Sequence, residues 1–258
     1  MPPLMNATPP PRAAVVDPLC APWESHPDGR VRLGVLFIHG FTGCPASLRP
    51  WAERTAATGY AVSLPRLAGH GTSWQEMTVT RWPDWYAGVE RAYDRLQERC
   101  ERVAVAGLSM GGALALRLAE HRDVAGTVLV NPAIATTDPR FKVLGILQHV
   151  LRSTPAIGGD IAKPGQDERS YPRTPLAPAH SMTRLWADVR GNLDQVAAPV
   201  LLFTSRTDHV VDPSSAAIIT GRIPTTDHRM LEDSYHVATL DHDADRIATE
   251  TLEFLARL

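Results

Sequence analysis

The sequence of 258 residues has little of what marks a membrane-spanning or disulfide-stapled protein. No apolar run approaches the roughly 20 residues that a membrane-spanning helix needs. The amino-terminal residues carry no basic segment ahead of an apolar stretch, so no secretory signal is predicted. Only three cysteines are present, at positions 20, 44 and 100, and their odd number without C-x-x-C spacing indicates neither a disulfide framework nor a zinc knuckle. These absences predict a cytoplasmic location.

The sequence also lacks a strong imbalance of charge. Its 26 lysines and arginines stand against 28 aspartates and glutamates, for a net charge of -2. No run of like charges forms the electrostatic footprint of a nucleic-acid-binding surface, so no nucleic-acid partner is expected. The apolar fraction of 44% and the charged fraction of 21% are typical of a globular protein that can build a core.

Proline is concentrated at the amino terminus, where eight of the 22 prolines fall within the first 27 residues. No apolar periodicity accompanies them, so residues 1–28 are predicted to form an extended lead-in. In residues 29–258, apolar runs typical of buried parallel strands alternate with helical patterns. The predicted strands are 31–40, 60–64, 102–106, 125–130, 199–204 and 227–231, and the predicted helices are 47–58, 84–99, 110–120, 213–221 and 243–258. This alternation predicts an α/β fold with a mostly parallel central sheet flanked by helices.

Residues 133–191 interrupt the alternation. They contain no convincing strand, and about 60 residues are too many for a loop, so a helical cap insertion over one edge of the sheet is predicted. One broad helical face carries Val143, Leu144, Leu147, Val150 and Leu151. This face either packs the cap on the sheet domain or, together with Ile146 and Ile157, lines a tunnel for an acyl chain.

The strongest chemical signal is the G-x-S-x-G motif from Gly107 to Gly111, centred on Ser109. A short buried strand precedes it and a helical pattern follows it, which is the context of a nucleophile elbow. A plain Gly-Ser turn is the alternative. The elbow would project the Ser109 hydroxyl above the sheet, beside the N–H groups at the start of the helix.

A serine hydroxyl needs a base to take its proton and an acid to orient that base, and both follow the serine in this fold. Asp208 comes soon after a predicted strand, whereas Asp212 directly precedes a proline and a helix and fits a helix cap better. His236 follows the last predicted strand and is the expected base. The competing histidines are His209, too close to Asp208 in sequence to face it, and His242, which fits a capping cluster.

An oxyanion hole needs two preorganised N–H donors. The predicted donors are the backbone N–H groups of Met110, after the nucleophile, and Phe41, in a glycine-rich loop after the first long strand. His39 and His70 are interpreted as anchors of their loops rather than as catalytic groups. No cofactor or metal is implied, because the sequence has no H-E-x-x-H, no P-loop and no G-x-G-x-x-G after a strand.

Five blocks, HGFTG, PRLAGHG, GLSMGG, TDHVVDP and SYHVATLD, occur in this order along the chain. Together they resemble bacterial monoacylglycerol lipases and related carboxylesterases of the α/β-hydrolase superfamily, over residues 35–258. The resemblance implies that Ser109, Asp208 and His236 form a triad, with Phe41 and Met110 in the oxyanion hole. It also places Glu168 at an acidic cap position that could accept hydrogen bonds from glycerol hydroxyls. A solvated surface glutamate is the alternative.

The expected function is hydrolysis of carboxylic esters, above all of monoacylglycerols to glycerol and fatty acid, through an acyl-enzyme. A general short-chain carboxylesterase or a carbon–carbon bond hydrolase could share the same triad, and a non-catalytic ligand-binding protein could share the fold. The expected partner is a small lipid ester, with transient contact between the cap and lipid surfaces. The sequence does not indicate an oligomeric state.

Overall fold

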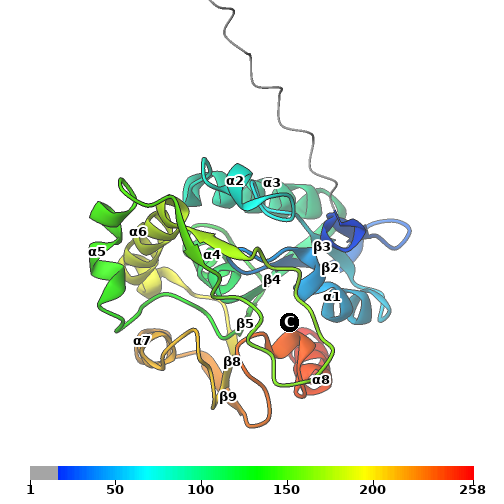
Figure 1. Ribbon diagram of the computed structural model, residues 1–258. Coiled ribbons are helices and arrows are strands. Elements are labelled where there is room, and N and C mark those ends of the chain that lie inside the picture. The colour runs from blue at the N-terminus through cyan, green and yellow to red at the C-terminus, as the bar shows by residue number, and fades with distance from the viewer. Residues whose placement is uncertain (1–16) are drawn as a thin grey trace, which may run out of the picture.

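The computed structural model describes residues 17–258, and a seven-stranded sheet runs through them (Figure 1). Across the sheet the strands follow the order β1-β3-β2-β4-β5-β8-β9. Their bounds are Trp23–Ser25 for β1, Val31–Ile38 for β2, Ala61–Leu64 for β3, Cys100–Leu108 for β4, Thr127–Val130 for β5, Val200–Ser205 for β8 and Thr226–Leu231 for β9. Only β1 is antiparallel to its neighbour. The predicted mostly parallel α/β sheet is confirmed.

Helices cover both faces of the sheet, which explains why its central strands are apolar on both sides. One face is covered by α3 (Trp82–Arg99), α4 (Met110–Ala119), α6 (Leu176–Asn192) and α7 (Ser214–Arg222), and the other by α1 (Arg49–Ala56) and α8 (Ala244–Leu255). Trp85 and Tyr93 belong to the core on the first face, and Phe37 and Trp51 pack edge to face on the second. The sheet thus forms the middle of three layers, and its carboxyl-terminal edge carries the connecting loops.

The 133–191 segment contains α5 (Arg140–Leu147), β6 (Ser153–Pro155) and β7 (Arg173–Pro175) ahead of α6. The two short strands pair antiparallel and were not predicted, because three residues each are too few to show a pattern. The apolar face expected on the first helix does not pack as a unit. Leu144 is buried against α6 residues, whereas Val143 is 52% exposed, since α5 is apolar on more sides than α6 covers. Val150, which follows the end of α5, is 78% exposed.

Part of the predicted lead-in joins the fold. Strand β1 pairs with β3, and the short 3-10 helix η1 (Pro18–Cys20) contacts η2 (Pro45–Ser47). This return of the chain brings Cys20 to Cys44, and the two form a disulfide. The expectation that no disulfide exists is therefore wrong, because the pairing depends on a tertiary contact that cysteine spacing does not reveal. Residues 1–16 of the lead-in lie outside the described residues.

Three short helices complete the described chain: α2 (Trp74–Met77) and the 3-10 helices η3 (Leu193–Gln195) and η4 (Ala238–Leu240). None of the helices within residues 17–258 combines the length and the apolar content that crossing a membrane requires.

Candidate active site

Ser109 occupies the turn between β4 and α4, at the carboxyl-terminal edge of the sheet. Its φ of 55° and ψ of -118° place a non-glycine residue in a strained backbone region. Such a conformation costs on the order of 1 to 3 kcal/mol and persists where the surroundings hold it. The Ser109 N–H donates to the carbonyl of Val130 at 3.0 Å, and the Ser109 carbonyl accepts from the N–H of Ala133 at 3.1 Å. The neighbouring strand β5 thus holds the turn in place.

The glycines of the motif are required by close packing around this turn. A Cβ on Gly111 would lie 1.9 Å from the carbonyl oxygen of Ile38, and a Cβ on Gly107 would lie 2.3 Å from the carbonyl oxygen of Gly111. Both distances are far below contact distance, so any side chain would push α4 away from β2 and β4. The G-x-S-x-G spacing therefore follows from the tight approach of α4 to the sheet.

Asp208 and His236 are brought together from the loops after β8 and β9. The Asp208 Oδ2 lies 2.8 Å from the His236 Nδ1, and both side chains are 8% exposed. The other oxygen, Oδ1, accepts from the N–H groups of Val210 and Val211, both at 2.8 Å. Because an ionised carboxylate only accepts, Nδ1 carries the hydrogen, and Nε2 is left with a lone pair that can receive a proton.

Asp212, the competing acid, serves a different purpose. Its carboxylate accepts from the N–H of Ser214 at the start of α7 and from the N–H of Thr137, at 2.9 and 2.8 Å. Burial alone would raise the pKa of Asp212, but these hydrogen bonds outweigh it and lower the pKa below the ordinary value. The carboxylate thus joins the start of α7 to the 133–191 segment.

Asn131, directly after β5, connects the loops of the site and was missed by sequence reasoning. Its Nδ2 donates to the carbonyl of His236 at 2.7 Å, and its Oδ1 accepts from the N–H of Ser205 at 2.7 Å. Asn131 is buried and has a φ of 45°. Ser109 itself makes no side-chain hydrogen bond within residues 17–258. Its backbone N–H donates to Val130, and the next residue, Asn131, continues the connection to the His236 loop. An asparagine directly after a buried strand is the signal that could have found it.

The two predicted oxyanion donors are Met110, directly after Ser109 at the start of α4, and Phe41, in the loop after β2. Neither the N–H of Phe41 nor that of Met110 donates a hydrogen bond to an acceptor in the part of the chain that the structure describes. Gly40 brings its loop against the nucleophile, because a Cβ on Gly40 would lie 3.5 Å from the Ser109 Cβ. The carbonyl of Thr42 accepts from the N–H of Tyr171 at 3.1 Å, which fixes the loop from the side of the 133–191 segment.

His39 and His70 anchor loops beside the site, as expected. The Nε2 of His39 accepts from the N–H of Leu67 at 3.2 Å, so its Nδ1–H donates to the Gly40 carbonyl at 2.9 Å. Burial lowers the pKa of His39 to about 4. The Nδ1 of His70 pairs with the Ala68 carbonyl at 3.0 Å, and burial, with His39 nearby, lowers the pKa of His70 well below its ordinary value. Both rings are neutral at neutral pH.

Glu168 and Ile157 lie in the 133–191 segment. Glu168 is 8% exposed, so it is not a solvated surface residue. Its Oε1 accepts from the N–H of Gly159 at 2.6 Å, and its Oε2 would lie 3.6 Å from a Cβ on Gly43 in the oxyanion loop. Ile157 is 47% exposed. The structure therefore places Glu168 against the oxyanion loop, whereas Ile157 remains largely open to solvent.

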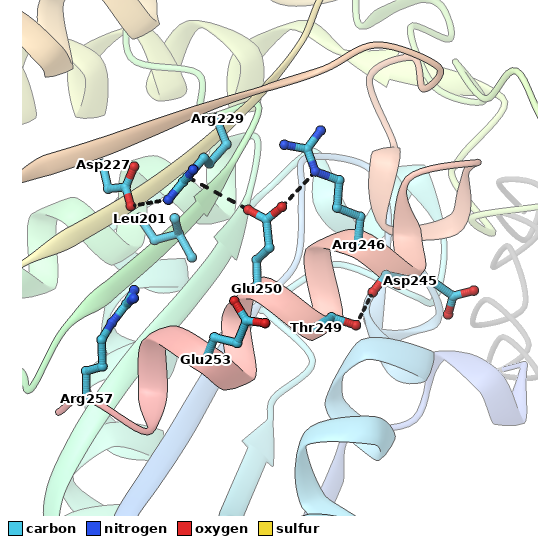
Figure 2. Close-up of a pocket in the computed structure, with 9 residues that line it drawn as sticks. All are labelled: Leu201, Asp227, Arg229, Asp245, Arg246, Thr249, Glu250, Glu253 and Arg257. Atoms are coloured by element: carbon cyan, nitrogen blue, oxygen red, sulfur yellow. Dashed lines mark hydrogen bonds and ion pairs between the residues drawn. The ribbon is translucent and has the colours of Figure 1, made fainter.

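A hollow of about 480 Å³ lies between α8 and the strands β8 and β9 (Figure 2). Four of its charged side chains form two ion pairs, Arg229 with Asp227 at 2.8 Å and Arg246 with Glu250 at 2.7 Å. Leu201 and Asp227 lie near the amino-terminal ends of their strands, and the predicted triad follows the carboxyl-terminal ends. This ion-paired hollow is therefore separate from the site around Ser109.

A parallel sheet covered on both faces, with a strained serine on a strand-to-helix turn and an Asp–His pair from later loops, defines an α/β-hydrolase. The chain belongs to the family described as serine aminopeptidase, S33, whose profile matches residues 29–243. It is 44% identical over 228 residues to a thermostable monoacylglycerol lipase from Bacillus sp. (strain H-257), covering 87% of this chain and 91% of that protein.

Further relatives agree with this assignment. A carboxylesterase from Bacillus subtilis (strain 168) is 30% identical over 227 residues, covering 87% of this chain and 92% of that protein. A structure reported for the metagenome-derived lipolytic enzymes LipS and LipT superposes with a TM-score of 0.90 at 38% identity, covering 94% of this chain and 100% of that chain. The predicted membership of the α/β-hydrolase superfamily is confirmed, and the protein is a hydrolase related to lipases and carboxylesterases.

Proposed function

We propose that the protein hydrolyses monoacylglycerols to glycerol and a free fatty acid, with Ser109, His236 and Asp208 as its triad. The observation that carries this proposal is the ordered Asp208–His236 pair beside the strained Ser109 turn. The 44% identity to a monoacylglycerol lipase supports the substrate class. A carboxylesterase with broader substrates is the second candidate, supported by the carboxylesterase relative.

In acylation, the Ser109 Oγ attacks the ester carbonyl carbon while His236 Nε2 takes the hydroxyl proton. The Asp208 carboxylate stabilises the imidazolium that forms, and the N–H groups of Phe41 and Met110 stabilise the negative oxygen of the tetrahedral intermediate. The intermediate collapses when the bond between the carbonyl carbon and the glycerol oxygen breaks, and His236 returns its proton to that oxygen. Glycerol leaves, and Ser109 carries the acyl group.

In deacylation, His236 takes a proton from a water molecule, which attacks the acyl carbonyl. The second tetrahedral intermediate uses the same two N–H donors. When the bond to the Ser109 Oγ breaks, His236 protonates that oxygen, and the fatty acid is released. The neutral His39 and His70 take no part in this proton transfer, because their pKa values lie far below neutrality.

The 133–191 segment is proposed to act as a cap that binds the substrate and contacts lipid surfaces. Its exposed aliphatic side chains support the surface contact, because aliphatic groups exposed together mark interaction sites. They are Val143, Ile146, Val150, Leu151 and Ile157. Ile157 and Glu168 are its proposed substrate contacts, Ile157 for the acyl chain and Glu168 for the glycerol hydroxyls.

The Cys20–Cys44 disulfide is evidence on the compartment in which the protein resides. The predicted cytoplasmic location rests on the lack of a secretory signal, on the lack of a long apolar run and on the small, odd number of cysteines, and the disulfide removes the last of these arguments. Disulfides persist mainly in oxidising compartments, with hyperthermophile proteins as an exception. Trapping the free thiols in freshly lysed cells, followed by a mobility shift, would show whether this pair is oxidised where the protein resides.

Fluorophosphonate labelling and hydrolysis of monoacylglycerols of graded chain length test the proposed function. We expect Ser109→Ala to abolish labelling and to lower kcat by several orders of magnitude, because no other residue forms the acyl-enzyme. Labelling that survives in Ser109→Ala would refute the nucleophile. Faster hydrolysis of short alkyl esters than of any monoacylglycerol would instead favour the carboxylesterase. In a parallel pair of variants, a larger loss in Asp212→Asn than in Asp208→Asn would refute the assigned acid.

A further inference from the structure

Asp160 lies between β6 and β7, and its side chain is 15% exposed. Its Oδ2 accepts hydrogen bonds from the backbone N–H groups of His209, at 3.1 Å, and His236, at 3.2 Å. Its Oδ1 contacts the Nδ1 of the His209 ring at 2.8 Å. One carboxylate therefore bridges the residue that follows Asp208 and the proposed base itself.

A second carboxylate, that of Asp241, joins the same two parts of the chain. Here the acceptor follows His236 in sequence, and the donors lie near Asp160. Asp241, which is 1% exposed, follows the His236 loop and accepts from the N–H groups of Ala162 and Lys163 at 2.7 and 2.8 Å. It also accepts from the N–H of Tyr235 at 2.9 Å. Burial alone would raise the pKa of Asp241, but the backbone donors outweigh it and lower the pKa. Residues 159–163 and the His236 loop are thus bound to each other by a carboxylate from each side, Asp160 and Asp241.

The position of the His236 loop in the sheet explains why such contacts matter. Strand β9 is the edge strand, so the loop that follows it has no further strand beside it on its outer side within residues 17–258. On its inner side Asn131 holds the His236 carbonyl. Residues 159–163 hold the loop on its outer side. Of these residues, Asp160 alone also contacts the Asp208 loop, through the N–H of His209.

We propose that Asp160 is a positioning residue, which holds the loops of Asp208 and His236 at the spacing that proton transfer requires. This inference rests on the proposed function, because it assumes that the Asp208–His236 pair is the acid–base pair. Asp160 touches neither substrate nor the reacting atoms. It acts through the backbone of His236, and a misplacement of about 1 Å in such a group can cost roughly a hundredfold in rate.

Three variants separate the contacts of Asp160. Asp160→Ala removes the side-chain contacts and keeps the backbone carbonyl that accepts from the N–H of Val237 at 3.0 Å. It is expected to lower kcat by roughly 10- to 100-fold on an aryl ester, with KM changed by less than about threefold. Asp160→Asn keeps an acceptor oxygen for the two backbone N–H groups and is expected to restore kcat to within about fivefold of the native enzyme. His209→Ala removes only the ring contact and is expected to stay within about threefold.

The rate constant of fluorophosphonate labelling is the second measurement, because labelling requires the base but no contact with glycerol. The labelling rate constant should fall in Asp160→Ala by about the same factor as kcat. In Asp160→Asn the labelling rate constant should return toward the native value. Asp167→Ala is the matched control, since Asp167 lies on the same connection and its carboxylate contacts only Arg169. That variant should match the native enzyme in both measurements. All rates are expressed per mole of folded enzyme, determined from the cooperative thermal transition.

The outcomes distinguish this inference from the proposed function. If Asp208→Asn is inactive while Asp160→Ala keeps kcat and labelling within threefold, Asp160 does not position the pair and the inference is overturned. An Asp160→Asn variant as impaired as Asp160→Ala would also overturn it, because the acceptor would then not matter. Should Asp160→Ala not fold, Asp160→Ser, with its shorter reach, replaces it and is expected to show the same loss. An active Asp208→Asn would instead refute the proposed triad.

Discussion

Ser109 and Asn131, which directly follow the neighbouring strands β4 and β5, have left-handed φ angles of 55° and 45°. Neither is glycine, so each conformation is held against a local cost by its hydrogen bonds. Ser109 is held through the backbone of β5, and Asn131 through its side chain, which reaches both Ser205 and His236. Ser109 and Asn131 thus connect the ends of β4, β5 and β8 and the loop after β9 by hydrogen bonds. These hydrogen bonds position the side chains proposed for proton transfer.

Substitution of Glu168 tests the proposed preference of the enzyme for glycerol esters. Removing an acceptor that faces a substrate hydroxyl costs about 1 to 3 kcal/mol, or roughly 5- to 150-fold in kcat/KM. Glu168→Ala is therefore expected to impair monoacylglycerol hydrolysis by that order while sparing an aryl ester of the same acyl chain. Paired kinetics on the two substrates measure the difference.

The Gly159 contact of Glu168 calls for a control. Because Oε1 already accepts from the Gly159 N–H, Glu168→Ala could also disturb the turn that contains Gly159. Glu168→Gln keeps one acceptor for this N–H and replaces the other oxygen by an amide donor. Equal losses on both substrates in Glu168→Ala, restored in Glu168→Gln, would assign Glu168 to the turn and contradict the glycerol contact.

Helix α4 carries the elbow at its start and Glu120 at its end. The pKa of Glu120 is raised to about 8, mainly by burial, with Arg117 opposing the rise and Asp188 and Asp194 adding to it. A negative charge at the end of a helix is also unfavourable to the helix dipole. The folded protein therefore holds a proton on Glu120 that the unfolded chain loses above its ordinary pKa of 4.5.

The proton on Glu120 gives a prediction of pH-dependent stability. Between about pH 4.5 and 8 the folded state binds more protons than the unfolded state, so this group makes stability fall as pH rises through that window. Glu120→Gln removes the effect and is expected to raise Tm more at pH 8.5 than at pH 5. Thermal melts of both proteins across this range measure it. Glu98→Gln, on the exposed side of α3, is the control, and an equal shift at both pH values would contradict the prediction.

The sheet and the Ser109 turn could be predicted from sequence, because their signals are local. Strands buried on both faces give continuous apolar runs, and the residues of the G-x-S-x-G motif around Ser109 are consecutive in the sequence. The three-residue strands β1, β6 and β7 are too short to show a pattern. Sequence left open whether the apolar face within residues 143–151 packs on the sheet domain or lines a tunnel, because periodicity does not show which neighbours a helix has. Asn131 and Asp160 act through partners over 45 residues away, which no local pattern contains.

At the scale of the whole molecule, the Cys20–Cys44 disulfide closes a loop with a sequence separation of 24. A bridge over a loop of this length contributes about 3 kcal/mol by restricting the unfolded chain. The double variant Cys20→Ser/Cys44→Ser is expected to unfold roughly 6 to 12 °C below the native protein. Calorimetry with and without dithiothreitol measures this. The reductant should lower the Tm of the native protein toward that of the variant and leave the variant unchanged, and a reductant-insensitive native protein would contradict the bridge.

The 133–191 segment meets the rest of the molecule on both sides of the site, through Tyr171 and Thr42 and through Asp160 and His236. In engineering terms, this segment is not an interchangeable module. A chimera that receives the corresponding segment of a relative, in order to change acyl-chain preference, would also exchange the supports of the loop that carries Phe41 and of His236, the proposed base. Such chimeras would lose turnover before they changed selectivity, unless the residues that receive these contacts were transplanted together with the segment.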